Sequence, residues 1–100
     1  MNGPRSTVVA GDSDTIERFE RVLARAGLMR WRVPGVNFVG HSAAVDVIET
    51  ALIDALSTLT PEPSRVPVYS TVTGGPHDTT RMDAGYWYRN LRDPVRFHTA

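Results

Sequence analysis

Phe38-Val39-Gly40-His41-Ser42-Ala43-Ala44-Val45 is the stretch on which the fold of this chain depends. A β-prone run ends at Gly40 and a helix-forming run begins after Ser42, so the sequence predicts a strand that passes into a helix at His41. Apolar residues then recur on one helical face as far as Leu59, and prolines end the helix two residues later. Ser42 is the expected N-cap, because a serine hydroxyl accepts a backbone N–H bond at a helix start.

Upstream of this junction, the pattern predicts a strand, a helix and a second strand. Residues 7–10 are a short apolar run closed by glycine, which is typical of a buried strand. The helical spacing that follows begins at a capping residue among residues 12–14 and ends at Gly27. Alternation of apolar and basic residues within residues 28–39 indicates a half-buried strand.

Downstream, a third strand is expected over residues 66–72, stopped by Gly74-Gly75-Pro76. A short helix is expected over residues 84–91, ending before Asp93-Pro94. We expect three of its side chains to point inward, those of Tyr86, Trp87 and Leu91. The predicted order is therefore β-α-β-α-β-α, an α/β or α+β fold class.

Composition excludes several classes of function. The chain has 100 residues and zero formal net charge, and all 11 of its basic residues are arginine. It therefore lacks the basic excess of a nucleic-acid or anionic-membrane binder. The absence of cysteine excludes disulfides and thiolate metal sites, and no apolar run approaches a membrane span. We expect a cytoplasmic protein with no metal, no nucleic acid and no membrane partner.

His41 is the candidate catalytic residue, because a histidine at a helix start can act as a general base. Gly40-His41-Ser42-Ala43-Ala44 resembles a Gly-x-Ser-x-Gly nucleophile elbow, yet its last position is alanine where the turn needs glycine. A hydrolase with Ser42 as nucleophile is therefore the weaker interpretation. His77 and His98 have no partners at metal-binding spacing.

Four motifs together resemble the acyltransferase domain of modular type I polyketide synthases, which serve antibiotic biosynthesis. The motifs are Asn2-Gly3-Pro4-Arg5-Ser6-Thr7-Val8-Val9-Ala10-Gly11, Gly40-His41-Ser42, Val66-Pro67-Val68-Tyr69-Ser70-Thr71-Val72-Thr73-Gly74 and Tyr86-Trp87-Tyr88-Arg89-Asn90-Leu91-Arg92-Asp93-Pro94-Val95-Arg96-Phe97. The resemblance implies that residues 1–36 are part of a ferredoxin-like subdomain and residues 37–100 part of a hydrolase-like α/β core.

The resemblance also implies an activity, in which an acyl group passes from coenzyme A to a serine and then to the phosphopantetheine of an acyl carrier protein. Further expected partners are the rest of the acyltransferase and the neighbouring ketosynthase region. The nucleophilic serine of the family's Gly-His-Ser-x-Gly elbow is absent from this chain. We therefore expect the fragment to be inactive alone and to bind no cofactor itself. The alternative is a non-catalytic α+β binding or docking module.

Site residues follow from the same resemblance. His41 matches the catalytic histidine that ends a four-residue specificity motif, and Phe38, Val39 and Gly40 occupy the three positions before it. Glycine stands where malonyl-type domains carry a bulky phenylalanine, which favours an α-branched extender unit, methylmalonyl first. Ethylmalonyl-type and starter-unit acyltransferases remain alternatives. Roles for Arg89, Asn90 and Arg92 do not follow from the sequence.

Overall fold

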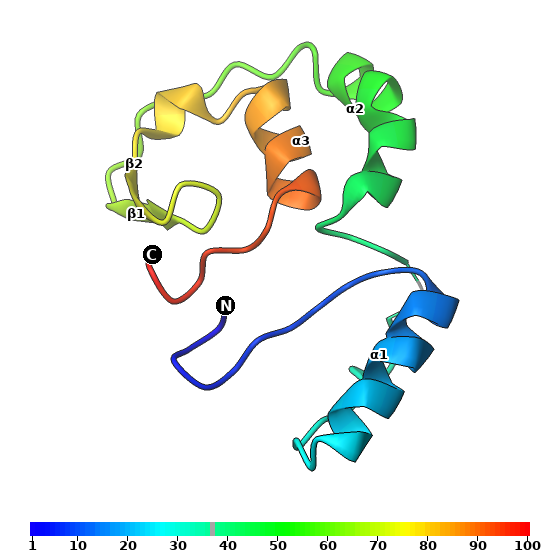
Figure 1. Ribbon diagram of the computed structural model, residues 1–100. Helices are drawn as coiled ribbons and strands as arrows, with labels where there is room; N and C mark the ends of the chain where they lie inside the picture. Colours follow the sequence, from blue (N-terminus) through cyan, green and yellow to red (C-terminus); the bar gives the residue numbers. More distant parts are fainter. Residues whose placement is uncertain (37) are drawn as a thin grey trace.

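The computed structural model describes residues 1–36 and 38–100. Helix α3 (Ala84–Arg92) lies between helix α2 (Glu49–Ala55) and a two-stranded hairpin, whereas helix α1 (Ser13–Arg25) stands apart below them (Figure 1). We call residues 1–36 the α1 part. In chain order the elements are α1 (Ser13–Arg25), the 3-10 helix η1 (Ala43–Ile48), α2 (Glu49–Ala55), β1 (Val68–Ser70), β2 (Gly75–His77), the 3-10 helix η2 (Thr79–Arg81) and α3 (Ala84–Arg92).

The helix expected after residues 12–14 is confirmed as α1. Asp12 is its N-cap, and the side chain accepts a hydrogen bond of 2.9 Å from the backbone N–H of Thr15. Gly27 follows the helix with φ of 67°, a left-handed conformation that suits glycine. Arg32 donates two hydrogen bonds of 2.8 Å to Glu20, so the segment after the helix runs back along its charged face.

The prediction of strands over residues 7–10 and 28–39 is wrong for the described residues, since neither segment pairs with a neighbouring strand. The second segment includes Asn37, which lies outside the described residues. A strand is stable only when another strand satisfies its N–H and C=O groups, and these two segments meet no such partner. Their side chains are accordingly open, with Val8 58% and Trp31 74% exposed. The predicted order β-α-β-α-β-α therefore differs from the observed order.

The single helix expected after Ser42 is instead two consecutive helices. The first, η1, is a six-residue 3-10 helix, and α2 continues it as far as Ala55. Val45 is buried, which agrees with its place on the apolar face, but Leu59 lies beyond the helix and is 42% exposed. Both η1 and α2 pack against α3.

Gly74-Gly75-Pro76 belongs to a hairpin, since Gly74 completes the turn and the next two residues lie in β2. Strand β1 is shorter than expected, and β2 pairs with it antiparallel, Tyr69 lying opposite Pro76. Proline is tolerated because each strand of a two-stranded sheet has a free edge. Gly74 makes the turn possible with φ of 78°, and a Cβ atom there would lie 2.6 Å from Thr99 Oγ1.

Helix α3 lies where the sequence predicts it and ends before Asp93-Pro94. Its Tyr86 is 3% exposed and turned inward as expected, but Trp87 is 40% exposed, so the inward placement of Trp87 is wrong. The Tyr86 hydroxyl and the buried Ser70 Oγ are hydrogen-bonded at 2.9 Å. This bond joins α3 to the end of β1.

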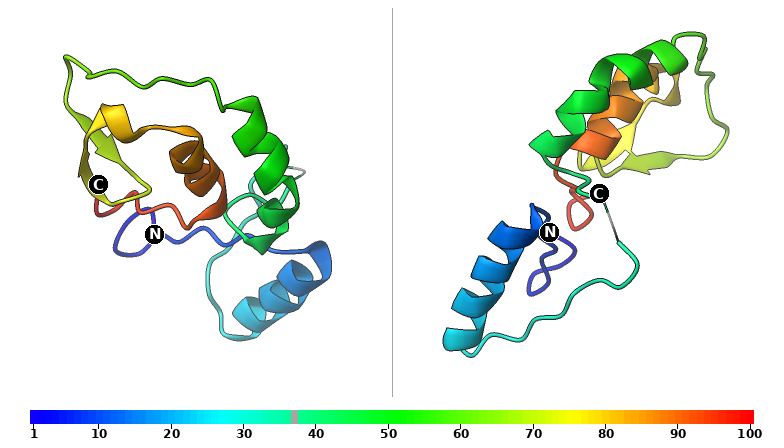
Figure 2. Two further views of the ribbon diagram at one scale, coloured as in Figure 1. Left: turned by 90° about the horizontal axis from the view of Figure 1, so that it is seen from above. Right: turned by 90° about the vertical axis from the view of Figure 1, so that its right-hand side faces the viewer.

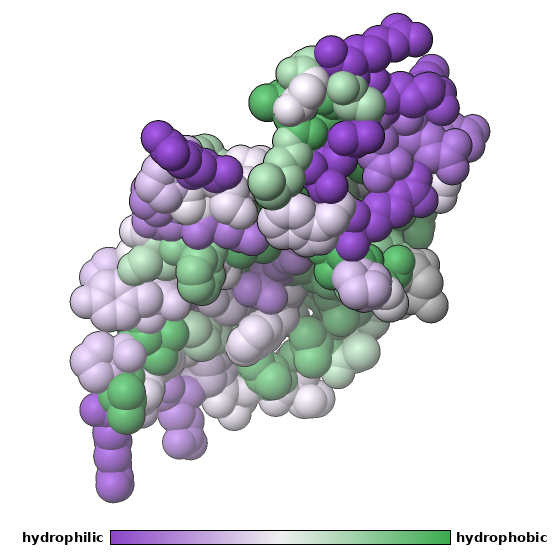
Figure 3. Space-filling view, turned by 90° about the horizontal axis from the view of Figure 1, so that it is seen from below, coloured by the Kyte–Doolittle hydropathy of each residue, from purple (hydrophilic) through white to green (hydrophobic). Residues whose placement is uncertain are grey.

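The molecule is elongated, with principal extents of 49 × 30 × 19 Å. Figure 2 shows that α1 stays apart from α2 and α3 in two further views. Helix α1 buries none of its residues, and hydrophobic residues lie open on the face shown in Figure 3. Within residues 1–36 and 38–100, no helix is both long enough and apolar enough to cross a membrane.

Candidate active site

His41 is held at the carboxyl end of α3 by its backbone. Its N–H donates a 2.8 Å hydrogen bond to the carbonyl oxygen of Leu91, in the last turn of the helix. Its φ of 56° is a left-handed conformation, which is uncommon for a residue with a side chain. A residue keeps such a conformation only where its surroundings hold it, and positions of this kind cluster at functional sites.

The imidazole of His41 is oriented by a second contact with the same turn. Its Nδ1 lies 3.0 Å from the carbonyl oxygen of Asp93. A carbonyl oxygen can only accept, so Nδ1 carries the hydrogen and Nε2 of the neutral ring is left with a lone pair. The ring is exposed, so Nε2 is accessible to a proton donor. Chemically, this arrangement can serve as a general base.

Ser42 caps η1, as the sequence predicts. Its Oγ accepts the backbone N–H of Ala44 at 3.2 Å and donates to the carbonyl oxygen of Val39 at 3.2 Å. Its backbone is extended, with φ of −149° and ψ of 171°, and is not the strained turn of a nucleophile elbow. Both bonds of the hydroxyl are thus used within the cap, and neither involves His41.

Phe38 and Gly40 lie against one another before His41, whereas Val39 is half-buried between them. A Cβ atom placed on Gly40 would lie 2.9 Å from Cε2 of the Phe38 ring, so the glycine leaves room for that ring. Gly40 is buried, but Phe38 is 65% exposed. The phenyl group therefore covers Gly40 on one side and is open to solvent on the other.

A charged cluster joins η1 to α3 next to this site. Asp46 Oδ1 accepts a 3.1 Å hydrogen bond from the Tyr88 hydroxyl and forms an ion pair with Nε of Arg92. The Arg92 hydrogen bond holds the pKa of Asp46 below its ordinary value of 3.8. Burial raises the pKa of Tyr88 above its ordinary value of 10.0, and its bond to the carboxylate adds to this effect.

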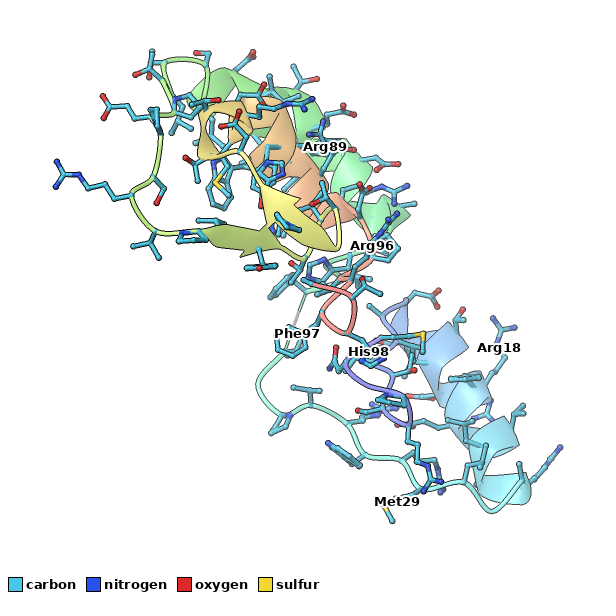
Figure 4. The ribbon with its side chains drawn as sticks, turned by 90° about the vertical axis from the view of Figure 1, so that its left-hand side faces the viewer. Arg18, Met29, Arg89, Arg96, Phe97 and His98 are labelled. Carbon is cyan, nitrogen blue, oxygen red and sulfur yellow. The ribbon has the colours of Figure 1, made fainter. Side chains whose placement is uncertain are left out.

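The two remaining histidines lie elsewhere. The His77 ring packs on Tyr86 with centroids 4.7 Å apart, and its Nε2 is buried without a partner among the described residues. His98 is in the C-terminal tail, where its N–H donates to the carbonyl oxygen of Met1 at 3.1 Å. Figure 4 places His98 and Phe97 at the waist between the two parts of the molecule. Neither histidine is brought to His41.

A shallow, open depression lies on the α1 part rather than beside His41. Charged side chains of the helix and the Trp31 ring line it. Such a solvated surface offers neither the enclosure nor the apolar lining of a small-molecule pocket. We therefore place the candidate site at His41, on chemistry and geometry.

Two contributors to the site are missed by the sequence. The Asp93 carbonyl carries no side-chain signal, although the following Pro94 restricts the backbone of Asp93 to an extended conformation, which the structure has with ψ of 157°. Asp46 looks like an ordinary exposed carboxylate. Its only signal is the four-residue spacing of Tyr88 and Arg92, which places them on one helical face.

Taken together, the described residues form a helical segment with one antiparallel hairpin, in which a backbone carbonyl oxygen orients His41 at the end of α3. The family model for the acyl transferase domain matches residues 1–100. The chain therefore belongs to the acyl transferase domain family.

Relatives agree with this family. Polyketide synthase GfsE of Streptomyces halstedii is 48% identical over 100 residues, which are 100% of this chain and 3% of that protein. A loading acyltransferase from the avermectin modular polyketide synthase has a TM-score of 0.94 and 43% identity, over 100% of this chain and 31% of that structure. The acyltransferase domain from module 8 of the salinomycin polyketide synthase has a TM-score of 0.93 and 41% identity, over 97% and 23%. The chain thus spans a small part of each relative.

Proposed function

We propose that this chain is the histidine-bearing segment of a polyketide-synthase acyltransferase, which transfers an acyl unit from coenzyme A to an acyl carrier protein. The observation that carries the proposal is the orientation of His41, whose Nδ1 lies 3.0 Å from the Asp93 carbonyl oxygen in a chain of the acyl transferase family. That contact leaves Nε2 as the proton acceptor.

In the proposed reaction, a serine from the rest of the domain is the nucleophile. Nε2 of His41 takes the serine proton as the oxygen attacks the thioester carbon, and returns it to the sulfur of coenzyme A as the C–S bond breaks. The same two proton transfers in the opposite sense pass the acyl group to the phosphopantetheine thiol of the carrier protein. No external reductant, oxidant or metal is needed.

For the substrate, we propose an α-branched extender unit, with methylmalonyl favoured. Gly40 contributes no side chain, and the Phe38 ring beside it is exposed enough to move. The Phe38 ring could then be displaced by the α-methyl group of the substrate. Ethylmalonyl and starter units fit the same argument less closely, because larger groups require a larger displacement of the ring.

We assign residues 1–36 to a ferredoxin-like subdomain and residues 37–100 to the hydrolase-like core. The separation of α1 from α2 and α3 supports this boundary. The open apolar side chains of the α1 part are expected to contact the remaining acyltransferase, with the ketosynthase region beyond it.

The test uses the intact domain, meaning the complete acyltransferase domain that contains this chain. Loading of the carrier protein from radiolabelled methylmalonyl-CoA should fall about 10²-fold or more in His41→Ala, since a general base contributes at least this much. His98→Ala is the matched control and should load normally. Residues 1–100 alone should load nothing. Normal rates in His41→Ala would contradict the proposal.

A further inference from the structure

We propose that Asp46 is a positioning residue for His41, acting through Arg92 and Tyr88 of α3. The inference rests on the proposed role of His41 as the base. It concerns a cluster that touches neither the ring of His41 nor Phe38 and Gly40, and that acts on the backbone carrying the histidine.

The cluster consists of one hydrogen-bond acceptor on η1 and two donors on α3. Asp46 Oδ1 accepts from the Tyr88 hydroxyl at 3.1 Å and from Nε of Arg92. Tyr88 and Arg92 are four residues apart on α3, so they occupy one face of that helix and converge on a single oxygen. A carboxylate held by two donors has a defined place relative to the helix.

The fixed position of Asp46 restricts the position of His41, because only a short length of chain joins the two residues. Four residues separate His41 from Asp46, and they include the Ser42 cap and the buried Val45. On one side of this stretch, His41 is bonded to the carbonyl oxygen of Leu91. On the other side, Asp46 is bonded to Arg92, the next residue of α3. The stretch is therefore attached to the same helical turn at both ends.

The double attachment explains how His41 keeps a left-handed backbone. Its φ of 56° is disfavoured for residues with a side chain. With only the Leu91 bond, the chain could pivot there, and the ring would move away from the Asp93 carbonyl oxygen. The attachment at Asp46 prevents this pivot, and so keeps Nδ1 bonded and Nε2 directed outward.

The exposure of the pair favours a positioning role over a stabilising one. The side chains of Arg92 and Asp46 are 31% and 49% exposed. Ion pairs so open to water contribute little to folding stability. Their removal should therefore leave the intact domain folded, while a small displacement of a catalytic group is enough to lower a rate severely.

The first experiment measures acylation of the intact domain in Asp46→Ala. We expect kcat to fall about tenfold, whereas KM for the acyl-CoA stays within about twofold, because ring orientation matters in the transition state more than in substrate binding. Arg92→Lys, which keeps the charge, should retain more activity than Arg92→Met. Asp54→Ala on α2 is the matched control, since Asp54 is an exposed carboxylate without an ion pair among the described residues, and it should behave as the wild type.

The second experiment separates positioning from a general structural role. In a His41→Ala background, Asp46→Ala should lower the residual rate no further, because its effect passes through the histidine. Additive losses in the double variant, or an unchanged kcat in Asp46→Ala, would overturn the inference. If Asp46→Ala does not fold, Tyr88→Phe supplies the same comparison with a smaller change. Normal loading by His41→Ala would instead refute the proposed function itself, so the two failures are distinguishable.

Discussion

The imidazole Nδ1 of His41 lies 3.0 Å from the carbonyl oxygen of Asp93, fifty-two residues later in the chain. In catalytic triads, a carboxylate holds the histidine in the tautomer that leaves Nε2 as the base. Here a backbone oxygen makes the corresponding contact, and it is as selective, because a carbonyl oxygen accepts a hydrogen bond and never donates one. The contact that orients the His41 ring therefore comes from a backbone carbonyl oxygen at the end of α3, where a triad has a carboxylate.

The first prediction concerns the tautomer of His41. At about pH 9, above the ordinary imidazole range, we expect the ring of the intact domain to carry its hydrogen on Nδ1. Long-range proton–nitrogen correlation spectra of histidine-labelled protein distinguish the two nitrogens, and the His41→Ala spectrum identifies the signal. A ring protonated on Nε2 would show that the contact with Asp93 does not form.

The second prediction concerns Pro94. A proline keeps the residue before it out of the helical region, and Asp93 is extended, with φ of −81° and ψ of 157°. Pro94→Ala should let α3 continue past Asp93 and withdraw its carbonyl oxygen, so kcat should fall about threefold to tenfold with little change in KM. Steady-state loading assays measure both constants. Pro63→Ala, in an exposed loop, is the control, and equal effects of the two variants would contradict this role of Pro94.

The third prediction concerns Gly40 and the Phe38 ring, which line the acyl site in the proposed function. An alanine Cβ at position 40 would lie 2.9 Å from Cε2 of Phe38, so the ring must shift and the space for an α-branch shrinks. We expect Gly40→Ala to lower the ratio of kcat/KM for methylmalonyl-CoA to that for malonyl-CoA about tenfold, as one methyl group commonly does. Competition assays with both substrates give the ratio directly. Gly40→Ala with Phe38→Ala should recover part of it, and an unchanged ratio in the single variant would remove Gly40 from the specificity argument.

Local signals in the sequence were sufficient for the elements that satisfy their own backbone. Helix α1 follows from a capping residue and a terminal glycine, and α3 from its apolar spacing and from Asp93-Pro94. The Ser42 cap was predicted in the same way. Each of these features depends on residues within about one turn, so periodicity and capping chemistry describe it fully.

Features that depend on distant partners were not predictable from the sequence. Residues 7–10 have the composition of a strand, yet composition supplies no partner with which to pair. The hairpin was missed because Pro76 argues against a strand, and only the pairing with Tyr69 shows that it lies at a free edge. At the site, residue type and motif identify His41, whereas its contact with the Asp93 carbonyl oxygen and the contacts of Asp46 with α3 form only in the tertiary fold.

The fourth prediction concerns the titration of Asp46. Because the Arg92 hydrogen bond lowers the pKa of Asp46 in the folded state, the ion pair stabilises the fold above the carboxyl's unfolded pKa of about 3.9. That contribution is lost as the pH falls from this value through the lower folded pKa. Carbonyl-carbon NMR titration should give a midpoint for Asp46 below 3.8, and Arg92→Gln should raise it. An Asp46 midpoint that does not change in Arg92→Gln would show that the pair does not form in solution. The midpoint of Asp12, which Thr15 lowers without Arg92, should stay the same.

The last prediction concerns the buried bond that joins α3 to β1. Ser70 Oγ and the Tyr86 hydroxyl are 2.9 Å apart, and Ser70 Oγ also accepts the N–H of Val72 at 3.1 Å. Ser70→Ala therefore leaves two polar groups without this partner and should lower the free energy of unfolding by about 1–3 kcal/mol, more than Tyr86→Phe. Ser70→Ala with Tyr86→Phe should cost less than the sum of the single changes, because the double variant leaves no orphaned hydroxyl. Urea unfolding of the intact domain measures these differences, with Ser57→Ala at an exposed turn as the control. Strictly additive losses would mean that the two hydroxyls do not interact, and that α3 is held on the hairpin by apolar packing alone.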